Sequence, residues 1–199
     1  MQDNEVRTFS PENRRHWRTW LQQHHTEEKS VWLVFYKNQS GISTITWSEA
    51  VDEALCFGWI DSVVRPLDEN RFMRFFSPRK KASAWSKINK EKVLKLVEDG
   101  LMTKAGFESI EAAKQNGSWT LLDQVEALLI PQDLASALNE QPGAERYIEA
   151  LSKSDKKAIL QWVALAKRPE TRSSRICEIV RCAAQNQKPK AIQWTKKAD

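Results

Sequence analysis

The chain has 199 residues, of which 41% are hydrophobic and 29% are charged, values typical of a soluble globular protein. Nine tryptophans, with only six glycines and seven prolines, exclude a disordered polymer and favour a packed body. The net charge of +5 permits contact with nucleic acid or another acidic surface but does not require it.

Three features of the sequence predict where the protein resides. The stretch from Met1 to Arg7 is polar and does not resemble a signal peptide. No apolar run approaches the roughly 20 residues needed to cross a bilayer. The three cysteines lack Cys-x-x-Cys spacing, which favours reduced thiols in a reducing compartment. We therefore expect a cytoplasmic protein with no membrane span.

The pattern of residues 10–36 predicts a helix followed by a buried strand. Ser10 and Pro11 match an N-cap and the first residue of a helix. The spacing i, i+3, i+4, i+7 then places four side chains on one helical face: Trp17, Trp20, Leu21 and His24. Residues 31–36 are almost continuously apolar, β-branched or aromatic, which indicates a central strand.

A second helix, a hairpin and two more helices follow. Thr46 and Glu49 form a capping-box pattern, and Gly58 ends the helix that this pattern begins. Residues 59–65 and 71–77 read as two strands joined by a turn at 66–70. Helices are predicted at 89–99 and 103–116, each ending at a glycine.

Beyond Gly117 the strand pattern disappears. Three prolines, Pro131, Pro142 and Pro169, stand at plausible helix starts, and helices are predicted at 131–139, 142–151, 153–167 and 169–186. The predicted fold class is therefore α+β. We expect a small antiparallel sheet with helices in residues 1–117, and an all-helical part with a basic tail in residues 118–199.

The predicted hairpin brings an aspartate and an arginine together. A symmetric four-residue turn would place Asp61 opposite Arg74 and Trp59 opposite Phe76. Such cross-strand pairs contribute roughly 0.2–1 kcal/mol each when they are purely structural. In the functional alternative, Asp61 orients Arg74 toward a ligand or binds the ligand itself. A register slip of one residue would place Asp61 on the other face.

The segment after the hairpin is strongly basic and leads into a helix. Cations in the first helical turn oppose the helix dipole, whereas a bound anion would reverse the sign of that interaction. The alternative is that the lysines simply point into water. Trp85 would either stack on a ring or base, or belong to the core. The predicted ligand-binding residues are Trp59, Asp61, Arg74, Arg79, Lys80, Lys81, Trp85, Ser86, Lys87 and Asn89.

A second basic helix start occurs near the C-terminus. Lys167 and Arg168 precede Pro169, and Arg172 and Arg175 follow it in the first turns of the predicted helix. We therefore expect Lys167, Arg168, Arg172 and Arg175 to form a secondary basic patch that would extend contact with a polyanion.

The sequence holds little that resembles a catalytic site. The three histidines all belong to the first predicted helix or its end, and no zinc-ligand spacing occurs. Ser77 and Lys80 match Ser-x-x-Lys, but the companion motifs are missing. We predict no catalytic residue, no metal and no cofactor.

Several collinear motifs resemble the YdeI/OmpD-associated family, also labelled bacteriocin-protection proteins, over roughly residues 9–186. They are Trp47–Val51, Glu53–Ser62, Phe76–Lys81, Trp85–Asn89, Asp99–Thr103 and Ala166–Arg172. The resemblance implies a link to stress and to tolerance of antimicrobial peptides or bacteriocins. It implies no particular reaction or cofactor.

Taken together, these observations predict a cytoplasmic, non-enzymatic protein that binds a small anion or a protein partner. The first alternative is a nucleic-acid-binding protein, whose ligand would be a phosphate-containing polymer. The second is an enzyme acting on a small anionic substrate, with Asp61 as base and Arg79 as clamp. The third is an interaction module in which the tryptophans are simply core.

Overall fold

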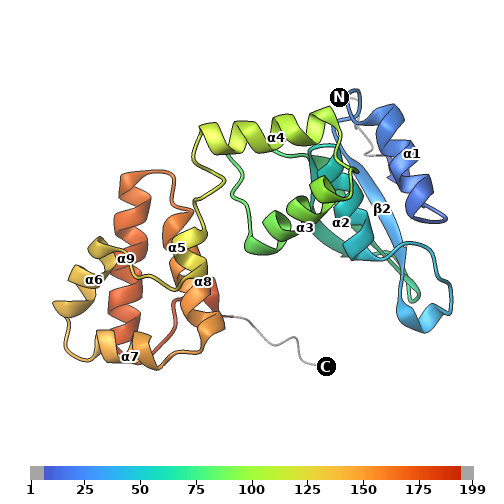
Figure 1. Ribbon diagram of the computed structural model, residues 1–199. Coiled ribbons are helices and arrows are strands. Elements are labelled where there is room, and N and C mark those ends of the chain that lie inside the picture. Colours follow the sequence, from blue (N-terminus) through green and yellow to red (C-terminus); the bar gives the residue numbers. More distant parts are fainter. Residues whose placement is uncertain (1–6, 194–199) are drawn as a thin grey trace, which may run out of the picture. The chain divides into compact units, whose positions relative to one another are not determined.

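The computed structural model describes residues 7–193, and these divide into two compact units (Figure 1). The first unit ends at Trp119 and the second begins at Thr120. The first contains a four-stranded sheet and helices, whereas the described part of the second is helical. The predicted α+β class is confirmed.

The sheet of the first unit has the strand order β1-β2-β4-β3. Three of its strands match the predicted ones, while β1 was not predicted because two residues are too few to show an alternating pattern. β1 pairs with β2 in parallel, and the remaining pairs are antiparallel. The strands are β1 (Thr8–Phe9), β2 (Val31–Tyr36), β3 (Trp59–Pro66) and β4 (Arg71–Pro78).

Helix α1 (Arg14–His24) begins later than the sequence suggested, so the predicted start at Ser10 and Pro11 is wrong. The side chain of Asn13 accepts a hydrogen bond from the backbone N–H of His16 and is therefore the N-cap. The predicted apolar face is present, since Trp17, Trp20 and Leu21 are buried.

Helix α2 (Trp47–Cys56) begins with the predicted capping box between Thr46 and Glu49. After it, Gly58 adopts a φ of +71°, which glycine tolerates far better than other residues. Helices α3 (Lys87–Glu98) and α4 (Lys104–Gln115) complete the unit and both pack against α2. A short 3-10 turn, η1 (Asn38–Ser40), follows β2.

The second unit is built around α9 (Pro169–Ala184), which packs against α6, α7 and α8. The short helix α5 was not predicted because four residues show no periodicity. The fully buried core side chains include Leu134, Leu138, Ile159 and Ile179. The other helices are α5 (Asp123–Glu126), α6 (Gln132–Asn139), α7 (Ala144–Ala150), α8 (Lys153–Ala164) and the 3-10 turn η2 (Lys190–Ile192).

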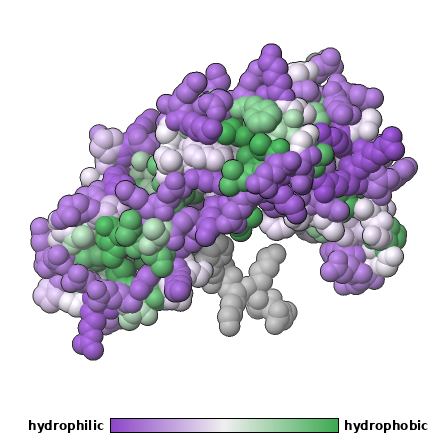
Figure 2. All heavy atoms as spheres, in the orientation of Figure 1, coloured by the Kyte–Doolittle hydropathy of each residue, from purple (hydrophilic) through white to green (hydrophobic). Residues whose placement is uncertain are grey.

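Apolar surface is concentrated in two places on the face drawn in Figure 2. One lies over α3 and α4, where Leu94, Val97 and Phe107 are exposed. The other lies over α6 and α9, where Ala137, Cys177 and Val180 line a shallow cavity. Within residues 7–193 no helix combines the length and the hydrophobicity that a bilayer crossing needs.

Candidate functional site

A carboxylate on the edge strand β3 binds an arginine and a tryptophan from two other elements. Asp61 of β3 accepts hydrogen bonds from Arg74 Nη1 of β4 at 2.8 Å and from Trp47 Nε1 of α2 at 2.9 Å. The Arg74 guanidinium carbon also lies 4.1 Å from the centroid of the Trp47 ring. We call Trp47, Asp61 and Arg74 the Asp61 cluster. Trp47 was not among the predicted site residues.

The strand register that produces this cluster differs from the predicted one. Asp61 lies opposite Phe76, and Trp59 lies opposite Pro78, so the predicted pairing is wrong by two residues. The pairing then shifts by one residue at an irregularity between Asp61 and Val64. A shift of two residues keeps Asp61 and Arg74 on the same face, and the ion pair forms diagonally.

A second arginine, Arg79, stacks on a tryptophan in the loop after β4. Its guanidinium carbon lies 3.9 Å from the centroid of the Trp85 ring, and Nη2 donates to the carbonyl of Ala84 at 2.9 Å. Burial lowers the pKa of Arg79 to about 10, against the opposing effect of the Asp61 charge. The Nε atoms of Arg79 and Arg74 are both buried without a hydrogen-bond partner within residues 7–193.

The two predicted tryptophans of the site lie in the core. Trp59 is 1% exposed, and its Nε1 donates to the carbonyl of His25. Trp85 is 2% exposed and packs against Trp119. Neither indole offers a free face on which a base or ring would stack.

Of the remaining predicted residues of this segment, Ser86 and Asn89 form the N-cap of α3 and the lysines are exposed. Ser86 is the N-cap of α3 and accepts from the backbone N–H of Asn89. Lys87 is exposed and lies 3.8 Å from Glu91, and Lys80 and Lys81 are also exposed. The three lysines therefore carry solvated charges, and Ser86 stabilises the first turn of α3.

The secondary basic patch belongs to the second unit, and two of its arginines hold helices together. Arg172 of α9 binds both carboxylate oxygens of Asp133 at 2.6 and 2.9 Å. Arg175 donates to the carbonyl of Trp162 and lies over its ring. Lys167 and Arg168 are exposed before the start of α9.

A buried ion pair between α1 and α2 was not predicted. Glu53 is only 3% exposed, and its two oxygens accept from Arg14 Nε at 2.5 Å and from Arg18 Nη1 at 2.6 Å. Glu53 was not among the predicted site residues. The available signal was its position three residues after Ala50, on the apolar face of α2, together with two arginines at i, i+4 in α1.

Glu53 and the burial around it shift the pKa values of the two arginines and of a nearby cysteine. Burial alone would lower the pKa of Arg14 and Arg18, but the hydrogen bonds and charge of Glu53 outweigh it and raise both. Burial raises the pKa of the nearby Cys56 thiol to about 11. A thiol of that acidity stays protonated at neutral pH and is a poor nucleophile.

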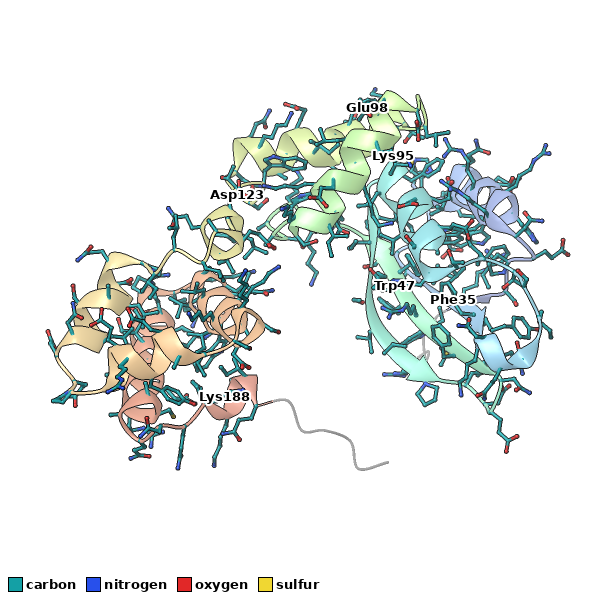
Figure 3. All side chains as sticks on the ribbon, turned by 60° about the horizontal axis from the view of Figure 1, so that its bottom comes forward. Phe35, Trp47, Lys95, Glu98, Asp123 and Lys188 are labelled. Carbon is teal, nitrogen blue, oxygen red and sulfur yellow. The ribbon has the colours of Figure 1, made fainter. Side chains whose placement is uncertain are left out.

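Two cavities adjoin these clusters. One of about 800 Å³ lies between η1, β2 and the start of α2, where Phe35, Phe72 and Trp47 line it together with polar side chains (Figure 3). The other, of about 500 Å³, lies beside the Glu53 ion pair and is lined largely by charged groups. Within residues 7–193 no group of three or more His, Cys, Asp or Glu side chains is arranged to hold a metal ion.

Two known protein families match separate parts of the chain. Residues 9–109 match "Domain of unknown function (DUF8412)", and residues 127–186 match "Bacteriocin-protection, YdeI or OmpD-Associated". The predicted family is thus confirmed for residues 127–186. Of the motifs that suggested it, only Ala166–Arg172 falls there, and the others fall in the first match. No curated protein and no solved structure matches the chain.

Proposed function

The chain belongs to the family described as Domain of unknown function (DUF8412), its second unit carries the YdeI or OmpD-associated domain, and we propose that it is a binding protein for a small anion. The anion binds in the first unit, at the Asp61 cluster and Arg79. The protein works without catalysis, in the cytoplasm, and supports tolerance of antimicrobial peptides or bacteriocins.

One observation carries this proposal: two arginines, each stacked on a tryptophan, feel the charge of one carboxylate, and only one of them binds it. Asp61 binds Arg74 directly, and it is the charge that acts on Arg79. Arg79 itself has no ion pair within the described part of the chain. The two guanidiniums and the single carboxylate leave one positive charge in a partly buried setting.

An anion would offset the positive charge that this arrangement leaves. A partly buried charge without a partner is unfavourable, and buried donors without acceptors cost about 1–3 kcal/mol each. Guanidinium groups bind carboxylates and phosphates through short, charge-assisted hydrogen bonds. Since Trp47 and Trp85 hold the guanidinium planes, little side-chain entropy remains to be lost on binding.

The exposed Lys80, Lys81 and Lys87 raise the question whether the ligand is a polymer or a compact anion. They would add long-range attraction for a phosphate-containing polymer, and the affinity of such a polymer would fall steeply with salt. With Trp59 and Trp85 in the core, base stacking on these rings would not contribute. A compact anion is therefore the better ligand for this site.

Isothermal titration with inorganic phosphate tests the proposal. We expect Arg79→Gln to weaken phosphate binding by on the order of tenfold, because a charge-assisted contact is lost. Lys104→Gln is the matched control, since Lys104 is 91% exposed and, among residues 7–193, pairs only with Glu108 on the same helix. Equal affinity of both variants and the unaltered protein, or no phosphate binding at all, would overturn the proposal.

The same pair of variants tests the proposed role in tolerance. Growth under a bacteriocin would be compared in a host that lacks its own copy of the gene and expresses one variant at a time. We expect Lys104→Gln to restore tolerance and Arg79→Gln to restore less of it. Equal rescue by both variants would show that tolerance does not depend on anion binding at Arg79.

A further inference from the structure

A charged cavity beside the buried Glu53 is separate from the proposed anion site. It has a volume of about 500 Å³ and lies where α1, α2 and α3 meet. It shares no residue with the Asp61 cluster or Arg79. Lys95, labelled in Figure 3, lies on α3, which supplies one wall. The lining residues are Arg14, Ser48, Asp52, Glu53, Lys92, Lys95, Leu96, Asp99 and Leu101.

Glu53 holds Arg14 in one orientation at the wall of this cavity. Its carboxylate binds Arg14 through Nε and is itself fixed by Arg18, whose Nη2 also donates to the carbonyl of Leu101 at 2.8 Å. The Nη1 and Nη2 groups of Arg14 have no hydrogen-bond acceptor within residues 7–193. A guanidinium anchored at Nε presents its other two nitrogens as a fork, which matches a carboxylate.

The opposite charge is also available in the lining. Lys92 binds one oxygen of Asp52 and the side chain of Ser48, which leaves the second oxygen of Asp52 unbonded. The side chains of Lys95 and Asp99 make no hydrogen bond or ion pair within the described part of the chain. Both signs are therefore open to a ligand in the same cavity.

The balance of charge selects the class of ligand. The lining has three cations and three carboxylates: Arg14, Lys92 and Lys95 against Asp52, Glu53 and Asp99. A ligand with a net charge would gain attraction from one set and repulsion from the other. A ligand that carries one charge of each sign is attracted to both sets. Leu96 and Leu101 add apolar surface between them.

We propose that this cavity binds a small zwitterion, a free α-amino acid with an apolar side chain. Its carboxylate binds the Nη groups of Arg14, and its ammonium binds Asp52 and Asp99. The side chain packs on Leu96 and Leu101. The cavity volume lies within the range typical of small-molecule sites, about 300–1,000 Å³.

Three probes that share the isobutyl side chain of leucine separate this proposal from simple ion binding. Leucine carries both charges, 3-methylbutan-1-amine carries only the ammonium, and 4-methylpentanoate carries only the carboxylate. Binding to the full chain at pH 7 would be measured by titration followed by NMR. We expect leucine to bind at least about tenfold more tightly than either analogue, since each analogue leaves one set of charges unpaired.

Two variants assign the contacts. Arg14→Gln should weaken leucine binding by on the order of tenfold. Asp99→Asn should weaken it by about threefold, whereas 4-methylpentanoate should bind as tightly or slightly more tightly, because Asp99 attracts the ammonium and repels a carboxylate. Lys104→Gln is the control and should change nothing.

The proposal fails if leucine binds no more tightly than the two analogues. It also fails if a folded Arg14→Gln variant binds leucine as the unaltered protein does. Should Arg14→Gln not fold, Asp99→Asn decides alone, because Asp99 is exposed and its loss threatens no core contact. Phosphate binding by the same samples reports on the anion site independently.

Discussion

The guanidinium carbon of Arg79 lies 3.9 Å from the centroid of the Trp85 ring, and this contact takes the place of an ion pair. A cation over an indole face is attracted by about 0.5–2 kcal/mol, which is less than a partly buried charge loses on leaving water. Arg79 is therefore a cation that the fold tolerates but does not need. This relationship leads to the first prediction.

Replacing Arg79 with methionine should leave the free energy of unfolding unchanged or raise it by up to about 1 kcal/mol. Methionine keeps the contact with Trp85 and removes the buried charge, and the loss of the hydrogen bond to Ala84 offsets part of the gain. Urea unfolding without added anion measures the effect. A loss above about 2 kcal/mol would instead make Arg79 a structural residue.

Replacing Glu53 with glutamine should cost about 3–5 kcal/mol, because two partly buried arginines would lose their shared carboxylate. Urea unfolding again provides the measurement. Glu91→Gln is the control, since Glu91 and Lys87 are both exposed, and we expect a change below about 0.5 kcal/mol. Equal effects of the two substitutions would contradict the burial argument.

The three thiols should differ sharply in reactivity. Cys177 is exposed, whereas Cys56 and Cys182 are buried, and burial raises the pKa of Cys56 to about 11. We expect one thiol per native chain to react quickly with a disulfide reagent at pH 8, and three after unfolding in urea. Cys177→Ala should remove the fast reaction. Fast modification of that variant would show that the core opens readily.

The raised pKa of Cys56 also predicts a pH dependence of stability. The folded state favours the neutral thiol, so its contribution is fully present below the ordinary thiol pKa of 9.0 and is lost as pH rises through about 11. Urea unfolding between pH 8 and pH 11 should therefore show less decline in Cys56→Ala than in the unaltered protein. Parallel curves would contradict the assignment.

Gly106 marks a close approach between α4 and α2, and Gly106→Ala should destabilise the first unit by about 1–3 kcal/mol. A Cβ atom at this position would collide with the backbone carbonyl of Cys56. In an exposed helix the same change would stabilise by about 1 kcal/mol, so the sign itself is informative. Glu108→Ala, on the exposed side of α4, should change stability by less than about 0.5 kcal/mol.

Local signals in the sequence were enough for much of the fold. The capping box at Thr46 and Glu49 defines the start of α2, and the apolar run of residues 31–36 defines β2. Both depend on neighbours a few residues away. The start of α1 was misjudged because Ser10 and Asn13 are both good N-caps, and only the folded chain chooses between them.

The candidate site was harder to predict because its contacts join distant segments. The predicted pairing of Asp61 opposite Arg74 was wrong, but the two still form an ion pair, since a two-residue shift in register keeps both on one face. Trp47 was missed because nothing local places the start of α2 over the hairpin. The network of Glu53 with Arg14 and Arg18 spans 35 to 39 residues, and only burial of the carboxylate makes it recognisable.

The border between Trp119 and Thr120 falls in the interval that neither family description covers, since one match stops at residue 109 and the other resumes at residue 127. The border between the sheet-bearing unit and the helical unit therefore agrees with the border between the two family descriptions. Each unit has buried apolar side chains of its own, so a substitution in the first, such as Glu53→Gln, should leave the helices of the second folded.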